Sequence, residues 1–134
     1  MRFVDSNVFV YHLAGDRRYG DIAAGILEKI DEGEEAVTST LVITQVCSYL
    51  RWKGRYSVIP RFLDYLFSTP EIAKGETSLA DFANARSLQR LTQLSWNHWD
   101  DLLIVAQMRR LGVTEIYSND SDYDKIPGIR RVFR

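Results

Sequence analysis

The sequence predicts an α/β fold, a three-layer sandwich in which a mainly parallel central sheet of four to five strands is flanked by helices. Short apolar runs that suit buried strands alternate along the chain with longer segments whose apolar residues recur at helical spacing. The chain has 134 residues, of which 46% are hydrophobic and 26% are charged, and this size and composition suit one core. We therefore expect a single domain over residues 1–134.

The first two strands and their helices have clear boundaries. Residues 2–5 form a short apolar run that ends in an acid, and the helix after it is expected to stop near Gly15. Residues 19–33 carry apolar side chains at helical spacing with charges on the opposite face, and the final glycine suits a helix end. The segment 36–39, Ala-Val-Thr-Ser, predicts a second short strand.

The middle of the chain predicts two helices and a third strand. Ser39 or Thr40 is suited to cap a helix that continues to Gly54. A helix over 58–67 has a dense apolar face and is stopped by a Thr-Pro pair, and such a face is typical of a surface buried between subunits. The segment 71–77 is expected to hold the third strand.

The last third of the chain predicts two helices and two strands. A helix is expected from Ser78, with an apolar face made of Leu79, Phe82, Ala83, Leu88 and Leu91. A second helix begins at Trp99 and is ended by Gly112. Strands are predicted at 115–118 and 131–133, which completes the alternation of strands and helices.

Composition excludes several classes of protein. Lys and Arg number 17 against 18 Asp and Glu, so the net charge is −1, and any contact with a nucleic acid must use a local basic face. The single Cys47 excludes disulfides within the chain and cysteine-based zinc sites. There is no phosphate-binding glycine loop, no signal peptide and no membrane-spanning segment, so we expect a cytoplasmic protein without a nucleotide cofactor.

Several carboxylates fall where a parallel sheet binds its ligands, which is beyond the carboxyl ends of the strands. Asp5 ends the first predicted strand, and Asp120 and Asp122 follow the fourth. Asp100 and Asp101 begin a helix whose first turn can face the same crevice. Each acid alone also has a structural interpretation, as a helix cap, a first-turn residue or a turn former.

Taken together, the acids indicate a metal site. Carboxylates gathered in one crevice repel each other unless cations neutralise them. Hard oxygen ligands of this kind suit Mg²⁺ or Mn²⁺, and such ions can activate a water for attack on a phosphodiester.

Three segments in this order resemble the PIN domain family, and within it the VapC-type toxin ribonucleases of toxin–antitoxin pairs. Residues 3–11, Phe-Val-Asp-Ser-Asn-Val-Phe-Val-Tyr, are similar to the first motif of the family. Residues 99–106, Trp-Asp-Asp-Leu-Leu-Ile-Val-Ala, are similar to its Trp-Asp-Ala-Leu-Ile helix start. Residues 117–124, followed by Ile-Pro-Gly-Ile, resemble its last motif. The resemblance spans essentially the whole chain.

The resemblance implies a PIN-like fold and a metal-dependent endoribonuclease that hydrolyses RNA, the toxin of a toxin–antitoxin pair. Catalysis and ligation of Mg²⁺ or Mn²⁺ would fall to Asp5, Asp100 and Asp120, with Asp122 as a fourth metal ligand. Asn7 and Ser118 would support these ligands through hydrogen bonds. The resemblance also implies a cognate antitoxin protein and a homodimer as partners. Because attack of water on phosphorus needs no 2′-hydroxyl, DNA is a second candidate substrate.

One position departs from the family pattern. The family has a Glu six residues after a serine in the helix that follows the second strand, and the count from Ser39 arrives at Gln45. Gln45 keeps a carbonyl oxygen that can support the site but removes one negative charge, so weaker metal binding is expected. Either Asp122 or Asp101 supplies the missing charge, or the protein is an inactive scaffold that binds RNA or protein.

Overall fold

The computed structural model describes residues 1–134 and contains one five-stranded sheet in the order β3-β2-β1-β4-β5, with every neighbouring pair parallel. The strands are β1 (Arg2–Val4), β2 (Ala36–Ser39), β3 (Ile72–Gly75), β4 (Glu115–Tyr117) and β5 (Arg130–Val132). The prediction of four to five mainly parallel strands is therefore confirmed.

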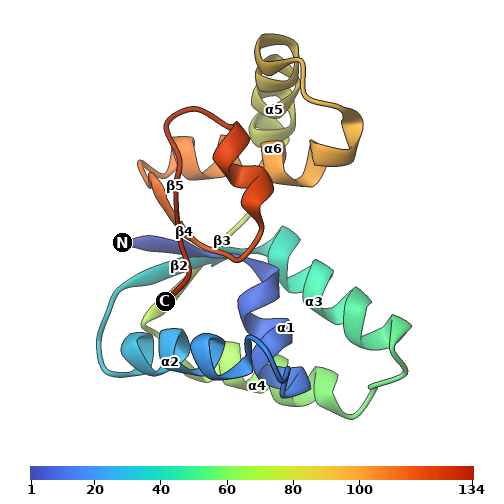
Figure 1. Cartoon of the computed structure of the whole chain (residues 1–134), viewed down its shortest axis with the longest axis vertical. Coiled ribbons are helices and arrows are strands. Elements are labelled where there is room, and N and C mark those ends of the chain that lie inside the picture. Colours follow the sequence, from blue (N-terminus) through green and yellow to red (C-terminus); the bar gives the residue numbers. More distant parts are fainter.

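Helices cover both faces of this sheet. In chain order they are α1 (Ser6–Ala14), α2 (Gly20–Asp31), α3 (Thr40–Trp52), α4 (Val58–Ser68), α5 (Leu79–Thr92) and α6 (Trp99–Arg110), with short 3₁₀ turns η1 (Trp96–His98) and η2 (Ser121–Lys125). Figure 1 shows α1 to α4 on one side of the sheet and α5 and α6 on the other. This arrangement is the predicted three-layer sandwich. None of the helices combines the length and apolar character that a membrane span requires.

The sheet is short but almost wholly buried at its centre. Phe3 and Val4 of β1, together with Ile116 and Tyr117 of β4, have no exposed surface. Helix α6 lies against this centre, and all seven residues from 102 to 108 are buried, although the sequence there shows little amphipathic pattern. A helix buried on several sides needs no polar face, and its position fixes where its first turn points.

Two predicted helix caps are confirmed by hydrogen bonds from backbone N–H groups to the capping side chains. The Ser39 hydroxyl accepts from Val42 N–H at the start of α3. At the start of α5, Ser78 accepts from Asp81 N–H, and the Asp81 carboxylate accepts from Ser78 N–H in return. This reciprocal pair is a capping box, and it sets the first residue of α5.

The apolar face predicted for α5 is wrong in part. Leu79 and Leu91 are 86% and 80% exposed, and Phe82 and Ala83 are also exposed. The buried residues of α5 are Asp81, Ala85 and Leu88. An acid occupies the packed face because Arg110 of α6 pairs with it, so the hydrophobic residues of the first turn are left on the outer face.

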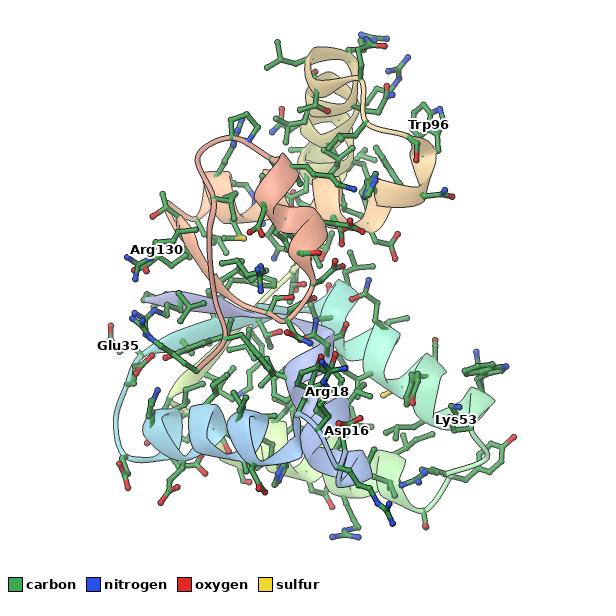
Figure 2. The ribbon with its side chains drawn as sticks, in the orientation of Figure 1. Asp16, Arg18, Glu35, Lys53, Trp96 and Arg130 are labelled. Carbon is green, nitrogen blue, oxygen red and sulfur yellow. The ribbon has the colours of Figure 1, made fainter.

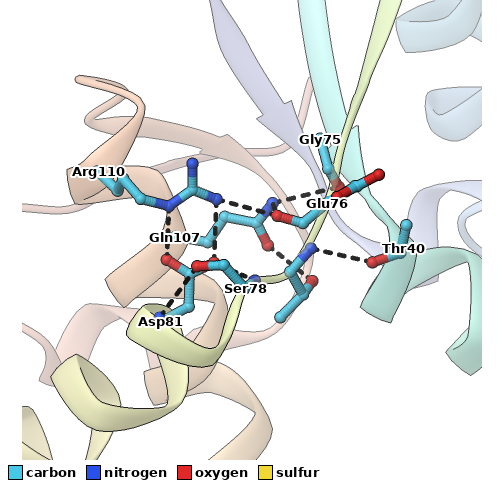
Figure 3. Close-up of polar contacts among 8 residues, drawn as sticks. Thr40, Gly75, Glu76, Ser78, Asp81, Gln107 and Arg110 are labelled. Atoms are coloured by element: carbon cyan, nitrogen blue, oxygen red, sulfur yellow. Dashed lines mark hydrogen bonds and ion pairs between the residues drawn. The ribbon is translucent and has the colours of Figure 1, made fainter.

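A polar network fixes α6 against the loop after β3, as Figure 3 shows. Arg110 Nε and Nη2 donate to the two oxygens of Asp81 at 2.8 and 3.0 Å. The buried Gln107 accepts from the Thr77 hydroxyl and donates to the Gly75 carbonyl. Thr77 N–H donates in turn to the Thr40 hydroxyl at the start of α3. The network therefore ties α6 to α3, the two helices that flank the site described next.

Candidate active site

The predicted acids converge where the strand order reverses. The chain runs outward from β1 to β2 and β3, then crosses back over the sheet to β4 on the other side of β1. Val4 is paired with Tyr117 across the two central strands, so their carboxyl ends lie side by side. Asp5 and Ser118 are the next residues, and Asp5 N–H donates to the Tyr117 carbonyl at 3.1 Å. Such a switch point is the usual ligand site of an open parallel sheet.

Ser118 joins the two central strands through its hydroxyl group, which is buried. The hydroxyl donates to Asp5 Oδ2 at 2.7 Å and accepts from Asn7 Nδ2 at 2.9 Å and from Asp120 N–H at 3.0 Å. Asn7 also contacts Asp5 Oδ2, at 3.3 Å, and accepts from Asn119 N–H. These bonds hold the segments after β1 and β4 in one position relative to each other. Asn7 and Ser118 therefore both bond to the Asp5 carboxylate, and their support of a metal ligand stays a prediction.

Asp5 is the most buried carboxylate of the group, with 5% of its surface exposed. Its Oδ1 accepts from Ser6 N–H at 2.8 Å, so Asp5 also caps α1. Burial raises the pKa of Asp5 to about 6, hydrogen bonds from Ser118 and Ser6 oppose this rise, and the charge of Asp120 adds to it. The structural interpretation of Asp5 as a helix cap is therefore confirmed, and its role in catalysis stays a prediction.

Asp100 and Asp101 turn to different neighbours. Asp100 Oδ2 accepts from Gln45 Nε2 at 3.0 Å, which places the departing position of α3 beside the acid that matches the family motif. Asp101 lies close to Asp5, Asp120 and Asp122: burial first, and then the charges of these acids, raise the pKa of Asp101 to about 7. The Gln45 carbonyl oxygen is buried and has no hydrogen-bond partner.

The segment after β4 adds two more acids, Asp120 and Asp122, to the site. The Asp120 carboxylate accepts from Asp122 N–H at 2.9 Å and so caps η2. Asp122 Oδ1 accepts from Lys125 Nζ at 3.0 Å, while its Oδ2 lies 3.5 Å from His98 Nδ1. Tyr123 is fully buried beneath the acids, whose charges help burial to raise its pKa well above the ordinary value.

The sequence did not identify His98 and Tyr123 as members of this site, and it named Asp101 only as a substitute for the missing charge. His98 precedes Trp99 at the junction of η1 and α6, so its position depends on that turn. Tyr123 follows Asp122 in the last motif, and its aromatic position there was the only signal available from the sequence.

The residues present fit a divalent cation. Asp5, Asp120 and Asp122 lie close enough to Asp101 for their charges to raise its pKa, and of these four aspartates only Asp122 forms an ion pair with a lysine or arginine. The Gln45 oxygen, His98 Nδ1 and the Tyr123 hydroxyl are buried polar atoms without partners. Uncompensated negative charge beside unsatisfied donors and acceptors is the environment that a bound cation stabilises. The hollow between α5 and α6, lined by Asn84 and Arg109 among others, lies apart from these acids.

Comparison with known sequences gives one family and close relatives. The model of the PIN domain matches residues 2–129. A VapC ribonuclease of Mycobacterium bovis and ribonuclease VapC13 of Mycobacterium tuberculosis are each 30% identical to this chain, and each match covers 98% of this chain and 99% of the relative.

Comparison with solved structures confirms the fold. VapC20 of Mycobacterium tuberculosis, a toxin that cleaves the sarcin-ricin loop, superposes with a TM-score of 0.77 and 18% identity over 92% of this chain and 93% of its own. VapBC2 of Rickettsia felis, bound to a DNA fragment from its promoter, gives a TM-score of 0.73 at 16% identity over 98% and 96%. A toxin–antitoxin complex of Klebsiella pneumoniae gives 0.66 at 16% identity over 96% and 95%.

The order of the motifs agrees with the position of the acids, which follow β1 and β4 and begin α6, and with a match over nearly the whole length. The chain therefore belongs to the PIN domain family, and to the VapC ribonucleases within it.

Proposed function

We propose that this protein is a metal-dependent endoribonuclease, the toxin of a toxin–antitoxin pair, and that its active site is the acidic group at the ends of β1 and β4. The observation that carries the proposal is the Ser118 hydroxyl, which holds Asp5 and the Asp120 backbone in one hydrogen-bonded unit in a chain related to VapC ribonucleases. The relatives favour this nuclease over the inactive binding module considered from Gln45.

The residues of the proposed site divide into metal ligands and residues that orient them. Asp5, Asp100 and Asp120 are the catalytic carboxylates and would hold Mg²⁺ or Mn²⁺, with Asp122 as the fourth acid. The ion would supply an acidified water and stabilise charge on the phosphodiester. Ser118 and Asn7 keep the Asp5 carboxylate oriented through hydrogen bonds at 2.7 and 3.3 Å. Gln45 orients Asp100 by donating a hydrogen bond, in place of the carboxylate usual in the family.

We infer the partners of this chain from its relatives. The Rickettsia felis and Klebsiella pneumoniae structures contain antitoxin complexes, and they support a cognate antitoxin for this chain. We also propose a homodimer and a cytoplasmic location, where RNA and an antitoxin would both be within reach.

The proposed function is tested by titrating Mn²⁺ into the wild type and Asp5→Asn in a calorimeter, with cleavage of a mixed-sequence single-stranded RNA followed in the same buffers. We expect saturable binding and cleavage in the wild type, and cleavage reduced by about 100-fold or more in Asp5→Asn. Asp64→Asn makes the same chemical change at an exposed position of α4 and should behave as the wild type. An Asp5→Asn protein as active as the wild type would contradict the assignment of Asp5 to the active site. Cleavage of DNA of the same sequence, measured in parallel, shows whether the protein prefers RNA.

A further inference from the structure

A histidine lies immediately before α6, beside the acids of the site, and it has no role in the proposed reaction. His98 Nδ1 lies 3.7 Å from Asp101 Oδ2 and 3.5 Å from Asp122 Oδ2. The three residues can each offer one ligand atom, and these atoms all lie within 4.8 Å of one another. In a six-coordinate ion with bonds of about 2.1 Å, adjacent ligands are about 3 Å apart and opposite ligands about 4 Å apart. The spacing is therefore close to that of a shared ion.

Two buried polar atoms, one in this group and one next to it, have no hydrogen-bond partner within the chain. His98 Nδ1 is shielded from solvent and makes no hydrogen bond, and the side chain as a whole is 14% exposed. Tyr123 has no exposed surface, and its hydroxyl is also unpartnered although it lies close enough to Asp101 for each to shift the pKa of the other. Unsatisfied buried groups are rare in folded proteins, and a bound ion with its waters would satisfy these.

The charge around Asp101 also lacks compensation. No lysine or arginine forms an ion pair with Asp101, whereas Asp5, Asp120 and Asp122 all face it. Lys125 contacts Asp122, but through Oδ1 at 3.0 Å, so the Oδ2 atom that faces His98 is not engaged by the lysine. The carboxylate oxygens turned to His98 are thus available to a cation.

We propose that His98, Asp101 and Asp122 form a second cation position, beside the ion of the proposed function, that takes Mn²⁺ or another first-row transition ion in preference to Mg²⁺. The preference follows from the imidazole ligand, since Mg²⁺ is held by oxygen atoms and keeps most of its water, whereas transition ions also accept imidazole nitrogen. Asp101 lies near His98 and also near Asp5 and Asp120, so the second position adjoins the first.

The test is pulsed electron paramagnetic resonance on the Mn²⁺-loaded protein, which detects an imidazole nitrogen bound to the ion whether or not the protein cleaves RNA. The chain has only two histidines, His98 and the exposed His12 of α1, so His12→Gln is the matched control. We expect nitrogen coupling in the wild type and His12→Gln, its loss in His98→Gln, and a fall of one Mn²⁺ per chain in the titration of His98→Gln. Excess Mg²⁺ should first displace the Mn²⁺ ion that shows no nitrogen coupling, because that ion is held by oxygen ligands alone.

Asp5→Asn separates this proposal from the proposed function. That variant should lose the ion held by Asp5 and keep the nitrogen-coupled ion. Nitrogen coupling that is absent from the wild type, that persists in His98→Gln, or that disappears in Asp5→Asn would each overturn the second position. Loss of RNA cleavage alone, with the coupling retained, would leave it standing.

Discussion

Asp5 serves folding and chemistry with the same carboxylate, and the two needs conflict. Its oxygens accept hydrogen bonds from Ser6 N–H, Asn7 and Ser118, so the side chain is tightly held. The same burial raises its pKa to about 6, because a charge is less favourable away from water. In the absence of a cation, the ionised form therefore costs the folded state free energy.

This cost predicts a pH dependence of stability in a chelating buffer. The pKa of Asp5 is raised from 3.8 to about 6 on folding, so between these values the folded state binds the proton more tightly. The contribution of Asp5 to the free energy of unfolding is then full below pH 4 and is lost as pH rises through 6, by about 3 kcal/mol at most. Thermal unfolding of Asp5→Asn and the wild type should show the difference moving in favour of the variant from pH 4 to pH 8. A difference that stays constant with pH would refute this account.

Gln45 makes the site less negative by one charge than the Glu usual in the family, and it also stabilises Asp100 through a hydrogen bond. A carboxylate in its place would lose the hydrogen bond to Asp100 Oδ2 and set two negative charges side by side. We predict that Gln45→Glu binds Mn²⁺ about tenfold more tightly and unfolds at a lower temperature than the wild type in chelator. Calorimetry and thermal unfolding measure the two effects.

The control for this prediction is Thr44→Glu, which adds the same charge at the preceding, exposed position of α3. If both variants bind Mn²⁺ alike, the gain is a long-range effect of charge and Gln45 is not part of the site.

At the scale of elements, the rotation of α6 about its axis decides which neighbours each of its two acids meets. Consecutive helical residues point about 100° apart, so Asp100 reaches α3 while Asp101 reaches the ends of β1 and β4. The burial of residues 102–108 and the network at the far end of the helix hold that rotation. Sequence periodicity could not predict it, because a helix that is apolar on most sides shows no preferred face.

The ion pair between α5 and α6 predicts a stability effect remote from the acids. Asp81 is fully buried, and Arg110 donates two hydrogen bonds to it. Arg110→Ala should leave that buried carboxylate without a charged partner and lower the free energy of unfolding. Chemical denaturation measures the loss.

Arg109→Ala is the matched control, since Arg109 is exposed and bonds only to the Pro127 carbonyl. A loss for Arg110→Ala no larger than that for Arg109→Ala would show that the pair contributes little to stability.

At the scale of the whole molecule, the crossing from β3 back to β4 creates both the active site and the uncovered outer face of α5. That face carries Leu79 and Phe82, and Trp96 projects beside it from the turn before α6, as Figure 2 shows. Phe82 and Trp96 both pack on Trp99, so the exposed apolar surface is continuous there. Contiguous apolar surface of this kind usually marks an interface.

We therefore predict that light scattering of the purified chain gives twice its mass of 15.5 kDa, and that Leu79→Lys with Phe82→Lys shifts the protein toward the monomer. Leu91→Lys, at the other end of α5, is the control for added charge on an exposed leucine. A double variant that remains dimeric would place the contact elsewhere.

The sequence by itself determined the alternation of strands and helices, most helix caps and the identity of Asp5, Asp120 and Asp122 as acids at strand ends. These features depend on periodicity, turn residues and motifs over a few positions, all of which are local. Only the tertiary structure decided which acid of α6 faces the strands, that the Ser118 hydroxyl links Asp5 to the segment after β4, and that His98 and Tyr123 lie beside them. Those contacts join residues as much as 113 positions apart, and they exist only because packing sets the rotation of each helix and the order of the strands.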